Sequence, residues 1–185
     1  WRAPANRTFL PVYEGKYGWQ FSHRYASHEA GSDVICSDTW LSSPSNLLVP
    51  ELYCDKEHFA EKLTSMGLDN NPCKSAFLGF RRVSSSTNER TSVACVFPWL
   101  PSTYGWILTI GADAMQIVLL NGAYNSLVFD FLLRNSLSQP SIPQGVFEQV
   151  SLPPLDRFGT MDLDFIVPRI LELTYTAHDL APFAR

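Results

Sequence analysis

Three short apolar segments in the middle of the chain constrain its fold more than any other feature. Residues 75–83 and 91–97 flank the polar connection 84–90, and residues 104–110 follow a few positions later. Short apolar runs bounded by polar residues, glycine or proline are typical of β-strands. The sequence therefore predicts three strands in this region.

Helices are predicted on both sides of these strands. Asp55 is a good N-cap residue for a helix that extends to about Met66 and ends at Gly67. Asn125 or Ser126 can cap another helix in the same way. That second helix is apolar around its whole circumference, which predicts burial between layers. The expected helices span residues 55–66, 112–121, 126–137 and 160–176.

The remaining segments complete the predicted domain. Short strands are expected at residues 8–13, 18–21 and 46–53, and the Ser-, Asp- and Gly-rich residues 27–46 are expected to form a long loop. Strands and helices follow one another without a regular β-α-β rhythm. We therefore predict an α+β domain with a mixed or antiparallel sheet and packed helices.

The domain is predicted to end near residue 155. The stretch before it is rich in Pro, Ser and Gln and ends in Leu152-Pro153-Pro154, which is typical of a linker. A recognition domain of residues 1–155 would then be followed by a helical segment, residues 156–185, leading into the rest of a longer protein. The chain begins with Trp1 rather than Met, and we interpret it as an excised piece.

Composition favours a folded protein and argues against several functions. Hydrophobic residues make up 45% of the 185 residues, which is ample for a core. No apolar run reaches the roughly 18 residues that a membrane span requires. The four cysteines and the pair His23 and His28 match no zinc or redox spacing. We therefore expect free thiols, no metal, no membrane partner and a cytoplasmic protein.

Charge is distributed unevenly along the chain. The net charge of −4 argues against a nucleic-acid partner, since phosphate contacts come from an excess of Lys and Arg. Residues 74–90, however, carry four cations against Glu89 alone: Lys74, Arg81, Arg82 and Arg90. A one-sided positive surface on an acidic body is still possible.

Two polar blocks carry most of the functional information. Each combines a cation, a carboxylate and neutral hydrogen-bonding groups, and each lies beside further basic residues. The blocks are Tyr13-Glu14-Gly15-Lys16, followed by His23-Arg24, and Thr87-Asn88-Glu89-Arg90-Thr91, preceded by Arg81-Arg82. This mixture favours oriented hydrogen bonding to a polar, anionic partner over simple solvation.

Enzymatic signatures are missing from the sequence. It contains no Gly-x-Gly-x-x-Gly, no phosphate loop and no Gly-x-Ser-x-Gly elbow. Pro50-Glu51 with Asp55-Lys56 has a faint likeness to a metal-dependent nuclease, but a helix cap explains Asp55 better. The sequence points to recognition and not to chemistry.

Five short segments follow one another in a recognisable order along the chain. They are Val12-Tyr13-Glu14-Gly15-Lys16, Gln20-Phe21-Ser22-His23-Arg24, Leu78-Gly79-Phe80-Arg81, Thr87-Asn88-Glu89-Arg90-Thr91 and, with Arg134, Asn125-Ser126-Leu127-Val128-Phe129-Asp130-Phe131. Their order and approximate spacing resemble the C-terminal target-recognition region of large adenine-specific DNA methyltransferases of the restriction–modification (type IIG-like) and phage-exclusion kinds. The resemblance covers roughly residues 9–155.

The resemblance implies a parent enzyme that transfers a methyl group from S-adenosylmethionine to adenine N6 in double-stranded DNA. Its catalytic methyltransferase domain would precede residue 1 in the same chain, because the Asn-Pro-Pro-aromatic motif is absent here. This piece would hold no cofactor and no catalytic residue, and would read the sequence while the base leaves the stack. Ser22 departs from the family, whose members often have Asp there.

The expected DNA-binding residues come from these segments. Lys16, Arg24 and Arg90 are candidates for phosphate contacts, although each could instead be ordinary surface charge or pair with a nearby carboxylate. For Arg90 with Glu89, bracing a turn is an equal alternative. The full set is Tyr13, Lys16, Gln20, His23, Arg24, Arg81, Asn88 and Arg90.

Amides and neighbouring arginines have further expected roles. Asn88 and Gln20 could read adenine edges in the major groove, but Asn88 could equally stabilise a turn. Arg81 and Arg82 should point to opposite faces of their strand, so that one faces DNA and the other is paired. Residues 125–134 are expected to be structural, with Phe129 and Phe131 in the core and Asp130 paired with Arg134.

Two other functions stay open at this point. A non-enzymatic protein-interaction domain is favoured by the acidic balance and by the aromatic residues Trp19, Trp40, Trp99, Tyr104 and Trp106. A hydrolase or nuclease using His23 and nearby carboxylates is less favoured, because no base and nucleophile can be named together.

Overall fold

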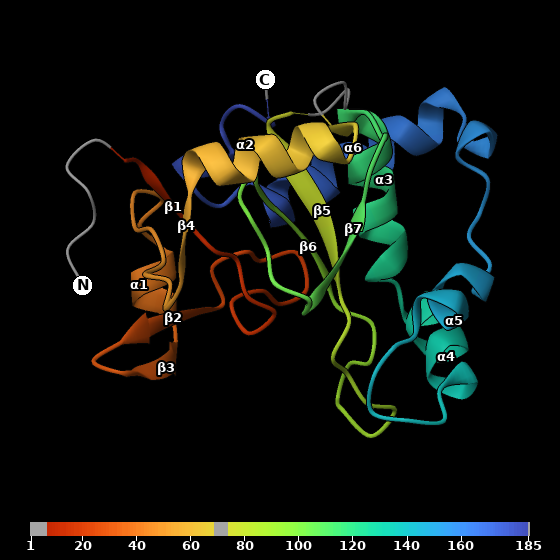
Figure 1. Cartoon of the computed structure of the whole chain (residues 1–185). Coiled ribbons are helices and arrows are strands. Elements are labelled where there is room, and N and C mark those ends of the chain that lie inside the picture. The colour runs from red at the N-terminus through yellow and green to blue at the C-terminus, as the bar shows by residue number, and fades with distance from the viewer. Residues whose placement is uncertain (1–6, 69–73, 185) are drawn as a thin grey trace.

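A three-stranded antiparallel sheet forms the centre of the protein (Figure 1). The computed structural model describes residues 7–68 and 74–184. In the sheet, β5 (Ala76–Arg81) lies between β6 (Ala94–Pro98) and β7 (Trp106–Thr109). Leu78 of β5 is opposite Val96 of β6 and Thr109 of β7. The predicted strands of residues 75–83, 91–97 and 104–110 and the α+β class are confirmed.

The central strands are apolar because both of their faces are buried. Successive side chains of a strand point to opposite faces, so Leu78 and Phe80 enter one core while Phe77 enters the other. The first core lies against the helices, and the second is built from aromatic side chains, including Tyr13 and Trp106.

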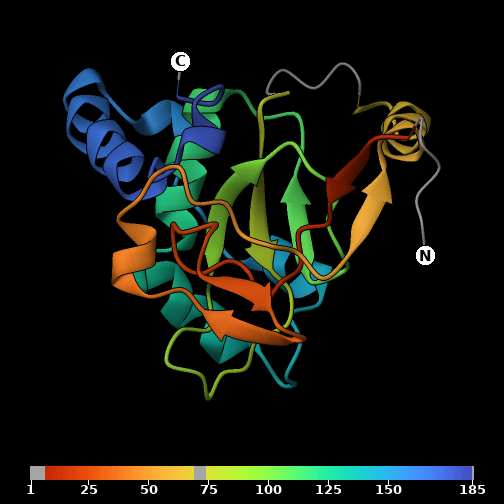
Figure 2. The same ribbon diagram turned by 90° about the vertical axis from the view of Figure 1, so that its left-hand side faces the viewer.

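Two peripheral strand pairs lie away from this sheet. The strand β1 (Phe9–Pro11) pairs antiparallel with β4 (Tyr53–Asp55), and β2 (Ala26–Glu29) forms a hairpin with β3 (Ser32–Ile35). Figure 2 shows the central sheet between helices α3 and α6 on one side and the β1–β4 pair with α2 on the other.

Capping residues position the helices as the sequence predicts. Asp55 accepts from the Glu57 amide at 2.9 Å, and Ser126 accepts from that of Phe129 at 3.1 Å. The α-helices are α1 (Asp38–Leu41), α2 (Lys56–Ser65), α3 (Ala114–Tyr124), α4 (Leu127–Ser136), α5 (Gln144–Gln149) and α6 (Thr160–Thr174). The 3-10 turns η2 (Leu155–Arg157) and η3 (His178–Leu180) precede and follow α6.

Several local predictions are wrong. Residues 18–21 form no strand, and residues 27–46 contain β2, β3 and α1 instead of one loop. In the stretch 46–53 only Tyr53 is in a strand. Phe131 is 65% exposed, so α4 is not buried all round, although Phe129 is buried as expected.

The segment after residue 155 packs into the same body as the rest. Helix α6 lies against α3, and Leu180 and Phe183 belong to the same core cluster as Leu78. The expected boundary at residue 155 therefore does not separate two cores. Apolar side chains of the last residues are buried because they complete the face of the sheet that α3 covers.

No single helix among the described residues is long and apolar enough to cross a membrane. Helices α3 and α4 taken together would meet that criterion, but they are bent by 65° at the break between them.

Candidate nucleic-acid interface

Two adjacent arginines at the end of β5 lack acidic partners. The Arg81 guanidinium lies 4.8 Å from the ring centroid of Trp19, and that of Arg82 lies 4.0 Å from the ring of Tyr104. Within residues 7–68 and 74–184, neither arginine forms an ion pair, and the buried Nε of each has no hydrogen-bond partner. We predicted that one of the two is paired; in this part of the chain the partner of each guanidinium is an aromatic ring and not a carboxylate.

A pocket of about 350 Å³ opens beside Arg81. Its walls come from two segments held together by backbone hydrogen bonds, since the Thr103 amide donates to the Tyr13 carbonyl at 3.1 Å and the Tyr13 amide to the Pro101 carbonyl at 2.7 Å. Gly15 and Gly105 pack backbone against backbone there: a Cβ on Gly105 would lie 3.1 Å from the Gly15 nitrogen. Burial lowers the pKa of the Arg81 guanidinium.

Lys16 lines the same pocket but is bound by carboxylates. Its ammonium lies 2.7 Å from Glu51, 3.0 Å from Asp33 and 3.4 Å from Glu14. Burial opposes the charged form, but the hydrogen bonds to Glu51 and Asp33 outweigh it and raise the pKa of Lys16. The first polar block is therefore an ion-pair cluster with excess acid and not a positive surface.

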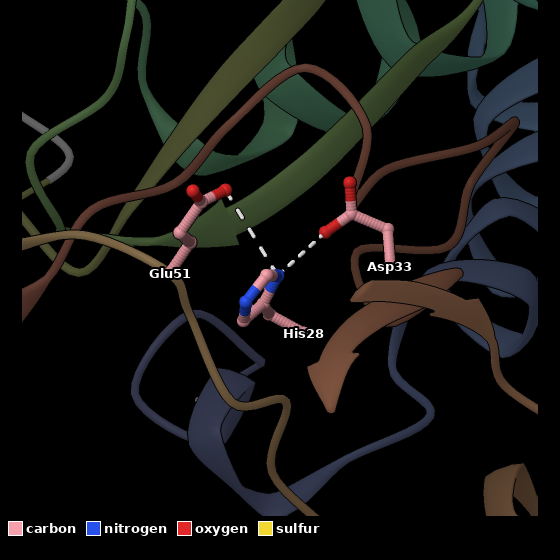
Figure 3. Close-up of side chains that lie close together, drawn as sticks. All are labelled: His28, Asp33 and Glu51. Carbon is pink, nitrogen blue, oxygen red and sulfur yellow. Dashed lines mark hydrogen bonds and ion pairs between the residues drawn. The ribbon is translucent and has the colours of Figure 1, made fainter. Parts of the chain in front are cut away.

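His28, Asp33 and Glu51 lie close together, as Figure 3 shows. The His28 Nδ1 lies 2.9 Å from Asp33 and 3.9 Å from Glu51. Imidazole and carboxylate are suitable ligands for a divalent cation. The Lys16 ammonium, however, contacts the same two carboxylate oxygens, so its positive charge already compensates part of their negative charge.

The His23-Arg24 pair is buried and holds the fold together. Arg24 is 0% exposed and donates to four backbone carbonyls, those of Leu41, Ser43, Asn46 and Thr176, at 2.7–3.1 Å. His23 is 1% exposed, and its Nε2 lies 3.0 Å from Asp179. Burial raises the pKa of the Asp179 carboxyl, but the His23 bond and charge outweigh it, and the net shift is downward.

Tyr13 is also structural, so three predicted DNA contacts need correction. It is 2% exposed, its hydroxyl donates to the His23 carbonyl at 2.7 Å, and its ring stacks on Phe97 at 4.2 Å. All three side chains are almost fully buried and are not on an open surface that duplex DNA could contact, although Tyr13 and His23 line a pocket of about 210 Å³. Ser22 accepts from the Arg24 amide at 3.3 Å, while the guanidinium itself is oriented by carbonyls.

Gln20, which lies between Lys16 and His23 in sequence, contacts Arg90 of the second polar block. With its amide oxygen toward Arg90, Gln20 accepts from Nε and Nη2 of that arginine at 3.0 and 2.8 Å. Arg90 also donates to the Asn125 carbonyl at 2.7 Å and lies 3.6 Å from Asp130. The alternative in which Arg90 braces a turn fits these contacts, and they leave little of its side chain for a ligand.

Side chains of α4 hold the connection of residues 84–91 in place. Asp130 accepts from the amides of Thr91 and Ser92 at 2.8 and 2.7 Å, and it pairs with Arg134 at 3.0 Å as predicted. Arg134 donates in turn to the carbonyls of Ser86 and Glu89. Asn88 lies exposed in this braced connection, which projects from the lower end of the sheet in Figure 1.

Of the eight predicted residues, Arg81 and Asn88 thus have the greatest freedom to contact a ligand. The sequence did not single out Thr103 and Gly105 as part of the site. It also did not predict the contact between Tyr104 and Arg82. The only available signal was the aromatic and glycine content of residues 103–106, which also fits an ordinary turn.

A separate apolar groove of about 450 Å³ lies between α3, α4 and α6. Leu119, Phe129 and Ile170 are among its walls, as is the exposed Val128. Helices α4 and α6 carry further exposed apolar side chains: Leu127, Phe131, Met161 and Phe165.

The three described cysteines, Cys36, Cys54 and Cys95, are free as expected; Cys73 lies outside the described residues. Comparison with protein-family models, with curated proteins and with solved structures finds no match to this chain.

Proposed function

We propose that this chain is a DNA-recognition module of an S-adenosylmethionine-dependent adenine-N6 methyltransferase. The observation that carries the proposal is the pair Arg81 and Arg82, two guanidinium groups without carboxylate partners at one end of β5. Arginine with unused donors is well suited to phosphate and to base edges. Arg24, Arg90 and Arg134, by contrast, are used inside the protein.

The proposed interface comprises the end of β5 and the braced connection 84–91. Asn88 is exposed there, and its amide can make two hydrogen bonds to an adenine edge. Asp130 and Arg134 fix the backbone of the connection, which would limit the entropy lost when DNA binds. The cofactor and the catalytic residues would belong to the methyltransferase domain of the same cytoplasmic parent.

The salt dependence of binding to duplex DNA tests this function. Replacing both arginines (Arg81→Gln with Arg82→Gln) should weaken binding to every duplex and reduce the slope of log affinity against log salt by about two units. The control is Lys62→Gln with Arg169→Gln, which also changes the net charge from −4 to −6 but lies on α2 and α6. Equal weakening by both pairs, or by neither, would contradict the proposal.

A protein-interaction function has its own supporting observation. Val128 lines the apolar groove, and Phe131 of α4 and Phe165 of α6 are also exposed; large exposed apolar side chains are of the kind that protein partners cover. In the proposed parent, the catalytic domain is the natural partner. Leu127→Glu with Phe131→Glu should abolish that association in a pull-down while leaving duplex binding unchanged; an unaffected pull-down would remove this role.

A further inference from the structure

The pocket beside Arg81 combines features that single it out from the rest of the surface. We call it the Arg81 pocket; it is lined by Glu14, Gly15, Lys16, Arg81, Thr103 and Gly105. The Trp19 ring supports one side of the guanidinium, whose Nε is buried without an acceptor. No acceptor within the described residues is hydrogen-bonded to the rest of this guanidinium either.

We infer that the Arg81 pocket binds one phosphodiester group of the DNA backbone. This inference deepens the proposed function and rests on it, because it assigns one phosphate to a defined site of the same interface. The guanidinium is a planar fork that matches two phosphate oxygens, and the Thr103 hydroxyl is a third donor on the same wall.

Two glycines fix the shape of the pocket by letting two of its walls pack closely. Gly15 and Gly105 are in contact, and a side chain on Gly105 would meet the Gly15 backbone at 3.1 Å. Glycine allows such a close approach of backbone to backbone because it has no Cβ. The segments that carry Lys16 and Thr103 are therefore held beside each other at the pocket.

The acidic residues around the pocket select for a ligand of low charge. Glu14 is part of the wall, and Asp33 and Glu51 lie directly behind Lys16. Their negative charges repel a dianion more strongly than a monoanion. A backbone phosphodiester carries a single charge, so it suits the pocket better than inorganic phosphate or a terminal phosphate.

NMR titration of the 185-residue chain tests the pocket directly. The probes are dimethyl phosphate, inorganic phosphate and a short duplex, and the signals are the Arg81 Nε–H and the Trp19 indole N–H. We expect both signals to shift saturably with dimethyl phosphate and with the duplex, and to shift less with inorganic phosphate at the same concentration.

Two substitutions and one control complete the test. Arg81→Gln should lower duplex affinity about tenfold and reduce the salt slope by about one unit. Thr103→Val keeps the side-chain volume and should lower the response to dimethyl phosphate even if Arg81→Gln disturbs folding. Arg82→Gln, which lies outside the pocket, should weaken duplex binding and leave the dimethyl phosphate response unchanged.

The outcomes separate this inference from the proposed function. If the duplex binds through Arg82 and neither dimethyl phosphate nor Arg81→Gln has an effect, the pocket assignment is overturned and DNA recognition stands. If dimethyl phosphate binds and the duplex does not, the phosphodiester pocket stands and the DNA function is overturned. Binding of neither removes both, and a stronger response to inorganic phosphate overturns the selectivity for a single charge.

Discussion

Arg24 and Arg81 show two different uses of an arginine in one molecule. Arg24 is fully buried and gives four hydrogen bonds to carbonyls of segments far apart in sequence. Arg81 is half-buried, lies over an aromatic ring and has a buried Nε without an acceptor. The Nε of Arg24 is also unpaired, but all four of its terminal N–H donors are used inside the protein, whereas the terminal donors of Arg81 have no hydrogen-bond acceptor among the described residues.

This difference shows that a function can be assigned to a basic residue of the polar blocks only when its hydrogen-bond and ion-pair partners within the protein are known. The region around His23 and Arg24 ties the C-terminal residues 176–180 to the loop that follows α1. At the end of β5 the guanidinium groups of Arg81 and Arg82 contact the rings of Trp19 and Tyr104, and they form no ion pair with any described residue. Breaking the first region should cost stability, and breaking the second should cost binding.

The largest expected effect is that of Arg24→Met. Four buried carbonyls would lose their donor at once, so the free energy of unfolding should fall by about 4 kcal/mol. Arg82→Met is the matched control, because it removes only a stacked guanidinium worth about 1 kcal/mol at most. Urea denaturation followed by circular dichroism measures both. Similar losses for the two variants would show that the comparison between the regions is wrong.

Asp130→Ala should have the next largest effect. The amides of Thr91 and Ser92 would be left buried without an acceptor, which should lower the free energy of unfolding by about 2–3 kcal/mol. Asp130→Asn keeps a carbonyl oxygen of similar shape and should lower it less. Hydrogen exchange at the two amides provides a local measurement, and unchanged protection in the Ala variant would show that Asp130 does not hold the connection.

The sequence predicted the parts of the fold that depend on local chemistry. The caps at Asp55 and Ser126 and the apolar central strands are recognisable because each uses a short-range pattern. The hairpin β2–β3 was missed because its two buried residues, Ala26 and Ser27, are adjacent and all of β3 is exposed, so no alternation of burial marks it. The exposure of α4 was missed because an apolar helix surface looks the same whether or not a partner covers it.

The candidate site was predictable only in part, because the partners of a charged side chain come from distant segments. Nothing near Lys16 in sequence reveals Asp33 or Glu51, and nothing near His23 reveals Asp179. The pairing of Asp130 with Arg134 was predictable because it spans one helical turn. Sequence patterns thus identified which residues are polar, and the tertiary fold decided which of them are satisfied.

Lys16→Met has the smallest expected effect, and it tests the comparison between Arg24 and Arg81. Lys16 lies between the two extremes, since it is paired like Arg24 but remains partly exposed like Arg81. Its hydrogen bonds lower the pKa values of the Glu51 and Asp33 carboxyls. At Asp33, the hydrogen bond with His28 lowers the pKa more than the one with Lys16 does. Without Lys16, the pKa values of both carboxyls should rise toward their ordinary range, more so for Glu51, in a pH titration of the side-chain carboxyl carbons by NMR. Lys62→Met on α2 is the control and should move neither. Unchanged titration of Glu51 in the Lys16 variant would mean that the ammonium is not held by the cluster and is available, after all, to a phosphate.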